Sequence, residues 1–153
     1  MYTTTIERHT QLTDELLQSI INLTEQIPEF DRRYSPQDYF QRLHNKPLMI
    51  QIISIEGELA GFKIGYSEQS GLFYSWLGAI LPEFRQLGLA KTLLNDQEKW
   101  AKDNGYITME VTTYNRFSAM LQMLIQQGYK IAGLQKNELE INNNKLILNK
   151  NIN

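Results

Sequence analysis

The chain of 153 residues contains no cysteine. Disulfide bonds, thiolate metal ligands and a cysteine nucleophile are therefore excluded, so a covalent acyl-enzyme would need another residue type. The only histidines, His9 and His44, lie far apart in the sequence without ligand-like neighbours, and we predict no metal site. The termini carry no apolar stretch long enough for a membrane span or a signal peptide. These absences predict a cytoplasmic protein with no membrane partner.

Neither sign of charge dominates the chain. The formal net charge is −2 and the sequence pI is near 5.7. A nucleic-acid surface would need clustered lysine and arginine. The cations in and before the central part of the chain form no such run: Lys46, Lys63, Arg85 and Lys91. We therefore expect no nucleic-acid partner, and the mildly acidic surface is compatible with a positively charged amine as substrate.

Length and composition fit one globular domain. Apolar residues make up 42% of the chain and charged residues 21%, the usual balance of a soluble protein. A chain of this size buries roughly 70% of its extended surface on folding, which is enough for a core without covalent staples. The sequence shows no repeat or linker, so we expect a single domain covering residues 1–153. A homodimer of this domain is left open.

Hydrophobic periodicity predicts alternating strands and helices. The predicted strands are 2–8, 48–55, 59–66, 72–81 and 106–112. The predicted helices carry apolar faces within 16–27, 36–44, 90–101 and 117–124. The strands from 48 to 81 form an antiparallel meander, whereas 106–112 should lie parallel to 72–81 because a helix crossover connects them.

The tail from Tyr129 to Asn153 predicts two more strands. Its apolar residues alternate as Ile131, Leu134, Leu139 and Ile141, and then as Leu146 and Leu148. The run of asparagines at 142–144 between these two sets tolerates left-handed backbone, which suits a hairpin turn.

The segment ILPEFRQLGLA, from Ile80 to Ala90, ends a strand and opens a helix through a glycine-containing turn. Pro82 cannot continue the strand, and Gly88 leaves room for a ligand to approach the backbone. The first amides of the helix have no intrahelical partner, and the positive end of the helix dipole lies beside them. These amides belong to Gln86, Leu87, Gly88, Leu89 and Ala90. The turn therefore predicts a phosphate site.

The spacing Arg85-x-x-Gly88-x-Ala90 resembles the cofactor motif of the GNAT superfamily of N-acetyltransferases, Arg/Gln-x-x-Gly-x-Gly/Ala. An apolar strand precedes the motif and an amphipathic helix follows it. Asn115 and the Gly128-Tyr129 pair stand where the family has its second motif. The order of predicted elements is also the order of this family, so the resemblance covers essentially the whole chain.

The resemblance implies an α+β fold with a mixed, mostly antiparallel central sheet flanked by helices. It implies acetyl-coenzyme A as cofactor, with its pyrophosphate on the amides of residues 86–90, and a small-molecule or peptide amine as acceptor. In this family the fourth and fifth strands splay apart, and Ile80 and Leu81 would offer backbone groups to the pantetheine or the oxyanion. Arg85 would contact phosphate or lie free on the surface. Asn115 would reach the pantetheine or cap its own helix.

Two positions depart from the catalytic pattern of the family. Many members have a tyrosine four residues before the glycine-aromatic pair, as the acid that protonates the sulfur, and here that position is Leu124. The proton is then left to water or to a residue such as Tyr114. Some members use a glutamate six residues before the position of Ile80, and here that position is Tyr74. Because a tyrosine pKa is ordinarily about 10, Tyr74 is expected to hold a hydrogen bond or a water.

Glu29 is the carboxylate that we favour on the acceptor side. It follows Pro28 in the loop between the first two helices, which by the resemblance covers the acceptor site. Its expected role is to bind the ammonium or relay its proton, and a solvated loop acid is the alternative. Of the other candidates, Glu83 and Glu110 are expected to be ordinary turn and strand residues with no role in the site. The remaining candidate side chains are Asp31 and Glu68, and the aromatics Phe30, Tyr34, Tyr66 and Trp76, which line an acceptor pocket or belong to the core.

The sequence thus predicts an acyltransferase that moves an acetyl group from acetyl-coenzyme A to a primary amine. Direct transfer in a ternary complex is the simpler mechanism because the chain has no cysteine. The alternative is a noncatalytic acyl-coenzyme A binding or sensing module, which Leu124 and Tyr74 keep open. Another phosphate ligand is disfavoured, since the chain has neither a P-loop lysine nor a Gly-x-Gly-x-x-Gly motif.

Overall fold

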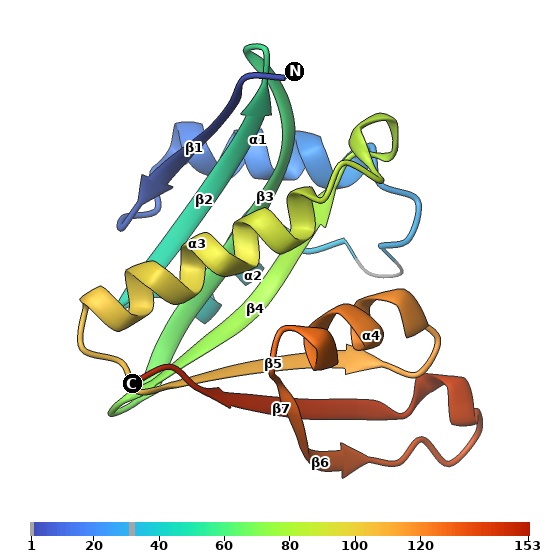
Figure 1. Cartoon of the computed structure of the whole chain (residues 1–153). Coiled ribbons are helices and arrows are strands. Elements are labelled where there is room, and N and C mark those ends of the chain that lie inside the picture. Colours follow the sequence, from blue (N-terminus) through green and yellow to red (C-terminus); the bar gives the residue numbers. More distant parts are fainter. Residues whose placement is uncertain (1, 31–32) are drawn as a thin grey trace.

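The computed structural model describes residues 2–30 and 33–153. In these residues seven strands form one mixed sheet in the order β1-β2-β3-β4-β5-β7-β6, and four α-helices pack on it (Figure 1). The strands are β1 (Thr4–His9), β2 (Leu48–Ile55), β3 (Glu58–Gln69), β4 (Leu72–Ile80), β5 (Thr108–Tyr114), β6 (Lys130–Gln135) and β7 (Lys145–Asn151). The helices are α1 (Asp14–Glu25), α2 (Pro36–Leu43), α3 (Leu89–Asp103) and α4 (Ser118–Gln126), with 3₁₀ turns at Pro82–Phe84 and Ile141–Asn143.

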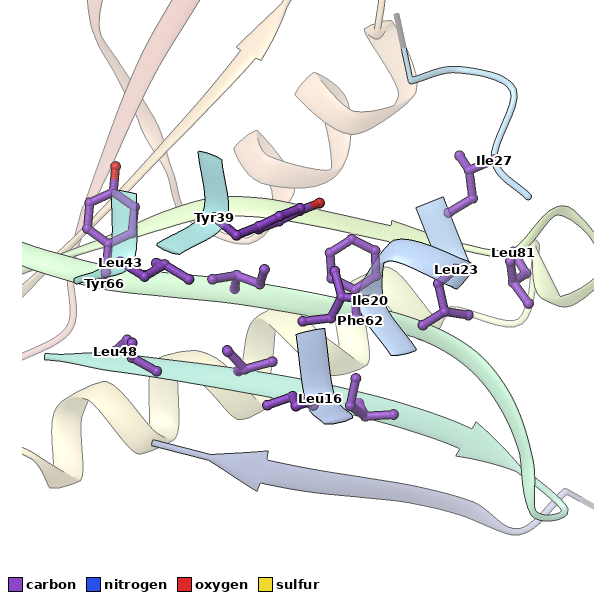
Figure 2. Close-up of a cluster of buried hydrophobic side chains, with 13 residues drawn as sticks. Leu16, Ile20, Leu23, Ile27, Tyr39, Leu43, Leu48, Phe62, Tyr66 and Leu81 are labelled. Carbon is purple, nitrogen blue, oxygen red and sulfur yellow. The ribbon is translucent and has the colours of Figure 1, made fainter. Parts of the chain in front are cut away.

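Helices cover both faces of the sheet. On one face, α1 and α2 bury Leu16, Ile20 and Tyr39 against β2, β3 and β4 (Figure 2). On the other face, α3 packs over β2 and β3, and α4 packs over β5 and β7. Along β5 and β7, residues that face α4 are buried, whereas residues that face the other way are only half-buried. This second face of β5 and β7 is therefore open to a ligand.

A bulge in β4 separates it from β5. The parallel pairing of the two strands runs only from Leu72 opposite Thr108 to Ser75 opposite Val111. The next residue, Trp76, has no partner on β3, and such an extra residue bends a strand and ends regular pairing. Beyond this point β4 follows β3 and β5 follows β7, so the two strands diverge (Figure 1).

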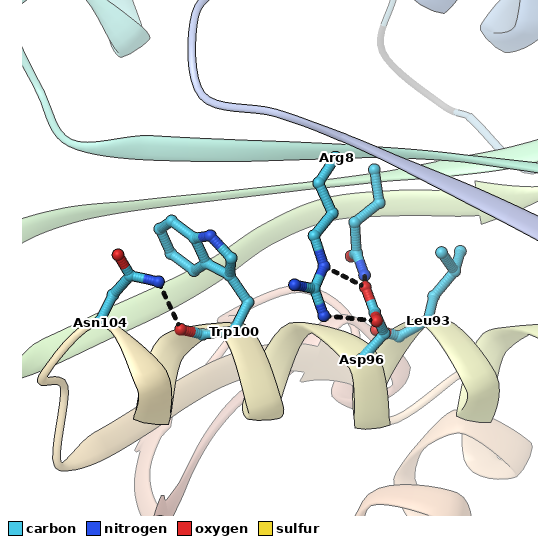
Figure 3. Close-up of polar contacts among 6 residues, drawn as sticks. Arg8, Leu93, Asp96, Trp100 and Asn104 are labelled. Atoms are coloured by element: carbon cyan, nitrogen blue, oxygen red, sulfur yellow. Dashed lines mark hydrogen bonds and ion pairs between the residues drawn. The ribbon is translucent and has the colours of Figure 1, made fainter.

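A polar cluster ties α3 to the first two strands (Figure 3). The Arg8 guanidinium donates Nε to Oδ2 of Asp96 at 3.1 Å and a terminal nitrogen to Oδ1 at 2.7 Å. The fully buried Gln51 donates to the same carboxylate at 2.8 Å and to the carbonyl of Leu93 at 3.1 Å. Burial works against ionisation of Asp96, but the hydrogen bonds from Arg8 and Gln51 outweigh it and hold the pKa of Asp96 below its usual value.

We expect Asp96→Ala to destabilise the protein by about 2 kcal/mol at neutral pH, because it removes the acceptor of the Arg8 guanidinium and one of the two acceptors of the buried Gln51 amide. Asp103→Ala, at the exposed end of the same helix, is the matched control and should cost well under 1 kcal/mol. The lowered pKa of Asp96 means that this stabilisation exists above the unfolded-state pKa and is lost as the pH falls through the folded-state value. Urea unfolding of both variants at neutral and acidic pH measures this, and equal losses at both pH values would contradict it.

Most predicted elements are confirmed within two or three residues, including the parallel pairing of β4 with β5. The tail prediction was wrong in one respect. Strand β6 ends at Gln135, and residues 136–144 form a long connection in which Leu139 and Ile141 are exposed. The reason is local: Asn137 Oδ1 accepts hydrogen bonds from the amides of Leu139 and Glu140, and this turn replaces the strand ladder.

Candidate active site

The turn before α3 has the geometry that the sequence predicts. Gly88 is the N-cap of α3 with a φ of +76°, and Gln86 has a φ of +66° although it is not a glycine. Apart from its chain neighbours and the adjacent helix backbone, no atom of the described residues lies within 4 Å of the position that a Cβ on Gly88 would occupy. Both residues are exposed, whereas Leu89 is buried and anchors the helix start in the core. The turn is thus a fixed backbone with open space in front of it.

The amides of this turn are free to bind a ligand. In the described part of the chain, the hydrogen bonds give no acceptor to the amides of residues 86–90, and no side chain caps Gly88. The first bond of the helix runs from the amide of Thr92 to the carbonyl of Gly88 at 3.0 Å. Since α3 has 15 residues, its dipole places partial positive charge at this end. A group of free amides on this dipole suits a phosphate anion.

Arg85 does not point freely into solvent. Its Nε donates to the carbonyl of Ile80 at 3.1 Å, and its guanidinium forms an ion pair with Glu29. Both side chains of this pair are more than a third exposed. The structure therefore joins two predicted site residues, one from the cofactor side and one from the acceptor side, at the end of β4. Glu29 therefore lies beside Arg85 at this end of the strand. Tyr74 lies roughly 20 Å from Ile80 along the same strand.

The free edge of β4 presents Gly78 and Ile80. The amide of Leu81 donates to the carbonyl of Ala60 on β3 at 2.8 Å, so the Leu81 backbone faces β3. Because neighbouring residues of an antiparallel ladder alternate, the backbone groups of Ile80 and Gly78 face the other way, toward the diverging β5. The prediction that Leu81 offers a free amide is corrected by this bond. Gly78, which the sequence analysis missed, takes its place.

Asn115 lies at the end of β5, but its side chain has another partner. Its Nδ2 donates to the carbonyl of Ile141 at 3.0 Å, and its amide donates to the carbonyl of Asn144 at 3.1 Å. Helix α4 starts at Ser118, and its N-cap residue Phe117 makes no side-chain capping bond. In this structure Asn115 thus holds the connection between β6 and β7 and does not cap its own helix, and its contact with pantetheine stays a prediction. Asp31 lies outside the described residues.

The open face of the sheet brings Tyr74 next to Glu110. Tyr74 and Glu110 are partners in the β4–β5 register, one rung before the strands separate, and Asn149 on β7 is the next residue across. The Tyr74 hydroxyl shares a 2.9 Å hydrogen bond with Thr112, and burial raises the pKa of Tyr74 above its usual value. The Oδ1 atom of Asn149 is buried without a hydrogen-bond partner among the described residues. A carboxylate and an unpaired amide oxygen thus lie side by side on this face.

Aromatic side chains continue this surface toward α2. Trp76 contacts Tyr34, Tyr39 and Tyr66 edge to face at centroid distances of 5.3 to 6.0 Å. Arg42 stacks 4.6 Å above the Trp76 ring. Tyr66 is buried and Tyr34 and Trp76 are half-buried, so this group belongs partly to the core and partly to the surface beside Tyr74.

One surface hollow, lined by the β3–β4 turn and the end of α3, lies away from these residues. Another lies between α1 and the turn at Pro82–Phe84 and reaches Leu81, but not Tyr74 or Glu110. The candidate site is therefore defined by unpaired backbone and side-chain groups around the β4–β5 divergence. No helix of the described residues is long and apolar enough to cross a membrane, and no three His, Asp or Glu residues gather there in a possible metal site.

A comparison with known protein families shows which kind of protein has these features. Residues 16–129, which span α1 to the residue before β6, match the acetyltransferase (GNAT) family. The chain belongs to the GNAT family of acetyltransferases. The prediction from the 80–90 segment is confirmed at the level of family and fold, and the chain is an enzyme of the acetyltransferase class. No curated protein matches the sequence significantly.

Solved GNAT structures share the whole fold. The ribosomal-protein-S18-alanine N-acetyltransferase from Escherichia coli superposes with a TM-score of 0.82 at 16% identity, covering 98% of this chain and 94% of that one. Ard1 from Thermoplasma volcanium gives 0.78 at 13% identity, with 97% of each chain covered. A GNAT family acetyltransferase from Elizabethkingia anophelis, solved with acetyl-CoA bound, gives 0.73 at 20% identity, again over 97% of each chain. At such identities the likeness shows the fold alone.

The residues of this GNAT chain fit the acetyl donor of the family, acetyl-coenzyme A. The pyrophosphate of acetyl-coenzyme A binds through several hydrogen-bond donors that point toward it from one side, and the free amides of residues 86–90 supply them. A side chain at Gly88 would fill the space in front of these amides. The free edge of β4 offers the amides of Gly78 and Ile80 and the carbonyl of Gly78 to the amides of pantetheine, whereas the Ile80 carbonyl already accepts from Arg85.

Proposed function

We propose that this protein is an N-acetyltransferase that moves the acetyl group of acetyl-coenzyme A directly to a primary amine. The observation that carries the proposal is the set of free amides before α3, which follow the end of β4 that has separated from β5. Bound there, acetyl-coenzyme A supplies a thioester whose carbonyl carbon an amine attacks. A cytoplasmic location and a small-molecule or peptide acceptor complete the proposal, and dimer formation stays a prediction.

On the cofactor side, the backbone does most of the binding. The amides of residues 86–90 hold the pyrophosphate, and the open space at Gly88 lets it approach closely. The backbone of Gly78 and Ile80 binds the pantetheine, and the amide of one of them donates to the carbonyl oxygen as negative charge develops there. Arg85 holds the end of β4 through the carbonyl of Ile80 and keeps Glu29 close to the phosphate side.

On the acceptor side, Glu110 replaces Glu29 as the favoured carboxylate. Glu29 is paired with Arg85 at the far end of β4, whereas Glu110 lies one rung from the point of divergence. An ammonium needs hydrogen-bond acceptors, and the Glu110 carboxylate and the Asn149 oxygen offer them together. Glu110 would accept the proton that the amine loses, directly or through a water. Tyr74 would orient the amine through its ring and its bond to Thr112.

The test of the proposed function is thiol release from acetyl-coenzyme A in the presence of panels of small amines and peptides with free N-termini. Release that depends on one class of amine supports the enzyme and identifies the acceptor class. Tight coenzyme A binding with no release across all panels would support the noncatalytic sensing module in its place. Absence of coenzyme A binding by calorimetry would overturn both.

A substitution at Gly88 tests the phosphate site directly. We expect Gly88→Glu to weaken acetyl-coenzyme A binding at least 100-fold, because the side chain fills the space before the amides and its carboxylate repels the pyrophosphate. Gly105→Glu is a matched control at the opposite end of α3, since Gly105 also has a positive φ, of +89°, and no atom within 4 Å of a Cβ. Calorimetry should find wild-type affinity for the Gly105 variant, and equal affinity in both folded variants would contradict the assignment.

A further inference from the structure

Lys63 lies on β3 with its side chain beside Gly78 of β4, on the face of the sheet that α3 covers. The two residues are partners in the β3–β4 register, and a Cβ on Gly78 would come within 3.2 Å of the Lys63 Cγ. Gly78 therefore leaves the space through which the lysine side chain runs. The side chain is half-buried, and this burial lowers the pKa of Lys63 from 10.5 to about 8. A lysine with such a pKa keeps a proton that it can release near neutral pH.

The Lys63 ammonium has no hydrogen-bond or ion-pair partner among the described residues. The Glu98 carboxylate of α3 attracts the ammonium electrostatically, but both Glu98 oxygens are occupied. They accept hydrogen bonds from the Tyr129 hydroxyl at 2.7 Å and from the Lys150 ammonium at 2.9 Å. The other carboxylate on this side of α3, Asp96, is taken by Arg8 and a glutamine of β2. Lys63 thus keeps its donors for a ligand.

Two more polar groups without partners lie along the same face. Gln97 on α3 is fully buried, and neither its oxygen nor its nitrogen has a hydrogen-bond partner in the described residues. The hydroxyl of the buried Ser75, at the last paired rung of β4, is also unpaired. A Cβ on Gly65, which is opposite Ser75 and two residues from Lys63, would lie 2.8 Å from the Gln97 nitrogen. Buried polar atoms without partners are rare, and their concentration here points to a polar ligand.

The chain lacks the acid that many GNAT enzymes place on the helix after β5. That position is Leu124, whose side chain is 1% exposed and lies in the hydrophobic core between α4 and the sheet. Resting on the proposed function, we infer that Lys63 is the acid of this enzyme and donates its proton to the sulfur of the departing coenzyme A. The amine nitrogen forms a bond to the carbonyl carbon, the carbon–sulfur bond breaks, and its electron pair stays on sulfur. The sulfur takes the Lys63 proton, and neutral Lys63 recovers a proton from solvent.

The two pKa values suit this transfer. The Lys63 pKa of about 8 lies below the pKa of an ordinary thiol, which is roughly 8.5 for a cysteine side chain, so proton transfer from the ammonium to the departing thiolate is favourable. Proton transfer between groups of matched pKa is efficient near neutral pH. Before the sulfur becomes neutral, the ammonium also stabilises the thiolate by charge.

The first experiment titrates the thiol of bound coenzyme A by the ultraviolet absorbance of its thiolate, which needs no acceptor. With wild-type protein, we expect the pKa of the bound thiol to lie at least about one pH unit below that in Lys63→Met, because a neighbouring cation favours the thiolate. Lys63→Arg should keep the wild-type value, since it keeps the cation. Lys99→Met, on the exposed side of α3, is the control and should titrate like wild type.

The second experiment uses the acceptor found in the amine screen. Lys63→Met and Lys63→Arg should both lower kcat about 100-fold with little change in KM, because arginine keeps the charge but does not release its proton near neutral pH. Equal thiol pKa values in wild type and Lys63→Met, with coenzyme A bound to both, would overturn the role of Lys63 and leave the proposed function intact. Full recovery of kcat in Lys63→Arg would overturn the proton transfer. Failure of the wild-type protein to bind coenzyme A would overturn the proposed function itself.

Discussion

Glu110→Gln is expected to lower kcat/KM for the amine acceptor by about 10² to 10³ while leaving the affinity for acetyl-coenzyme A unchanged. The glutamine keeps the shape of the side chain and can still accept a hydrogen bond, but it has no charge for an ammonium and no basic oxygen. Glu110 lies on the open face next to Tyr74, whereas the donor amides precede α3 on the opposite face of the sheet. Loss of turnover should therefore be separate from cofactor binding, which steady-state kinetics and calorimetry measure.

Two other carboxylates provide the controls. Glu83→Gln changes an exposed residue of the 3₁₀ turn and should leave both parameters at wild-type values. Glu29→Gln removes the ion pair with Arg85, and because this pair is exposed we expect a change of less than about tenfold. An enzyme with Glu110→Gln and wild-type efficiency across the pH range would exclude the acceptor role of this residue. A large loss in Glu29→Gln alone would restore Glu29 as the acceptor carboxylate.

The cofactor turn was predictable from sequence because its determinants are local. Pro82 ends the strand, Gly88 adopts a positive φ, and the next apolar residues set the helix phase within a few positions. The same local logic explains the helix starts, such as that of α2, where Ser35 is the cap and Pro36 is the first helical residue. Where a few neighbouring residues fix the backbone, the pattern alone is enough.

The partners of the site residues were not predictable, because they depend on register between distant strands. Whether Leu81 or Ile80 faces β5 is decided by one hydrogen bond to Ala60. The neighbours of Glu110 come from β4 and β7, and the phase of β4 changes at the Trp76 bulge. In the sequence Glu110 is one more polar residue in an alternating strand, so its position at the divergence gave no signal.

The surroundings of Lys63 were not predictable from the sequence for the same reason. The burial of Lys63 also predicts a second large effect, which is on the stability of the folded protein. The sequence shows a lysine between two apolar residues, and only the missing side chain of Gly78 across the ladder explains how it fits. Its ammonium is half-buried without a partner, which costs free energy in the folded state. The pKa falls from 10.5 to about 8, a difference of 2.5, and at 1.36 kcal/mol for each pKa step this gives a cost of roughly 3 kcal/mol as an upper bound.

We therefore expect Lys63→Met to stabilise the ligand-free protein by about 2 kcal/mol at neutral pH, with an advantage that shrinks at high pH. Below pH 8 both the folded and the unfolded states hold the proton, so the wild type bears the full cost. Between about pH 8 and 10.5 the folded state releases the proton while the unfolded state keeps it, and wild-type stability rises relative to the variant. Urea unfolding at about pH 7 and about pH 10, with Lys99→Met to correct for the change in net charge, measures this difference. An advantage that is independent of pH would show that the gain comes from packing of the methionine, and a less stable Lys63→Met would show that the ammonium has a partner in the folded protein.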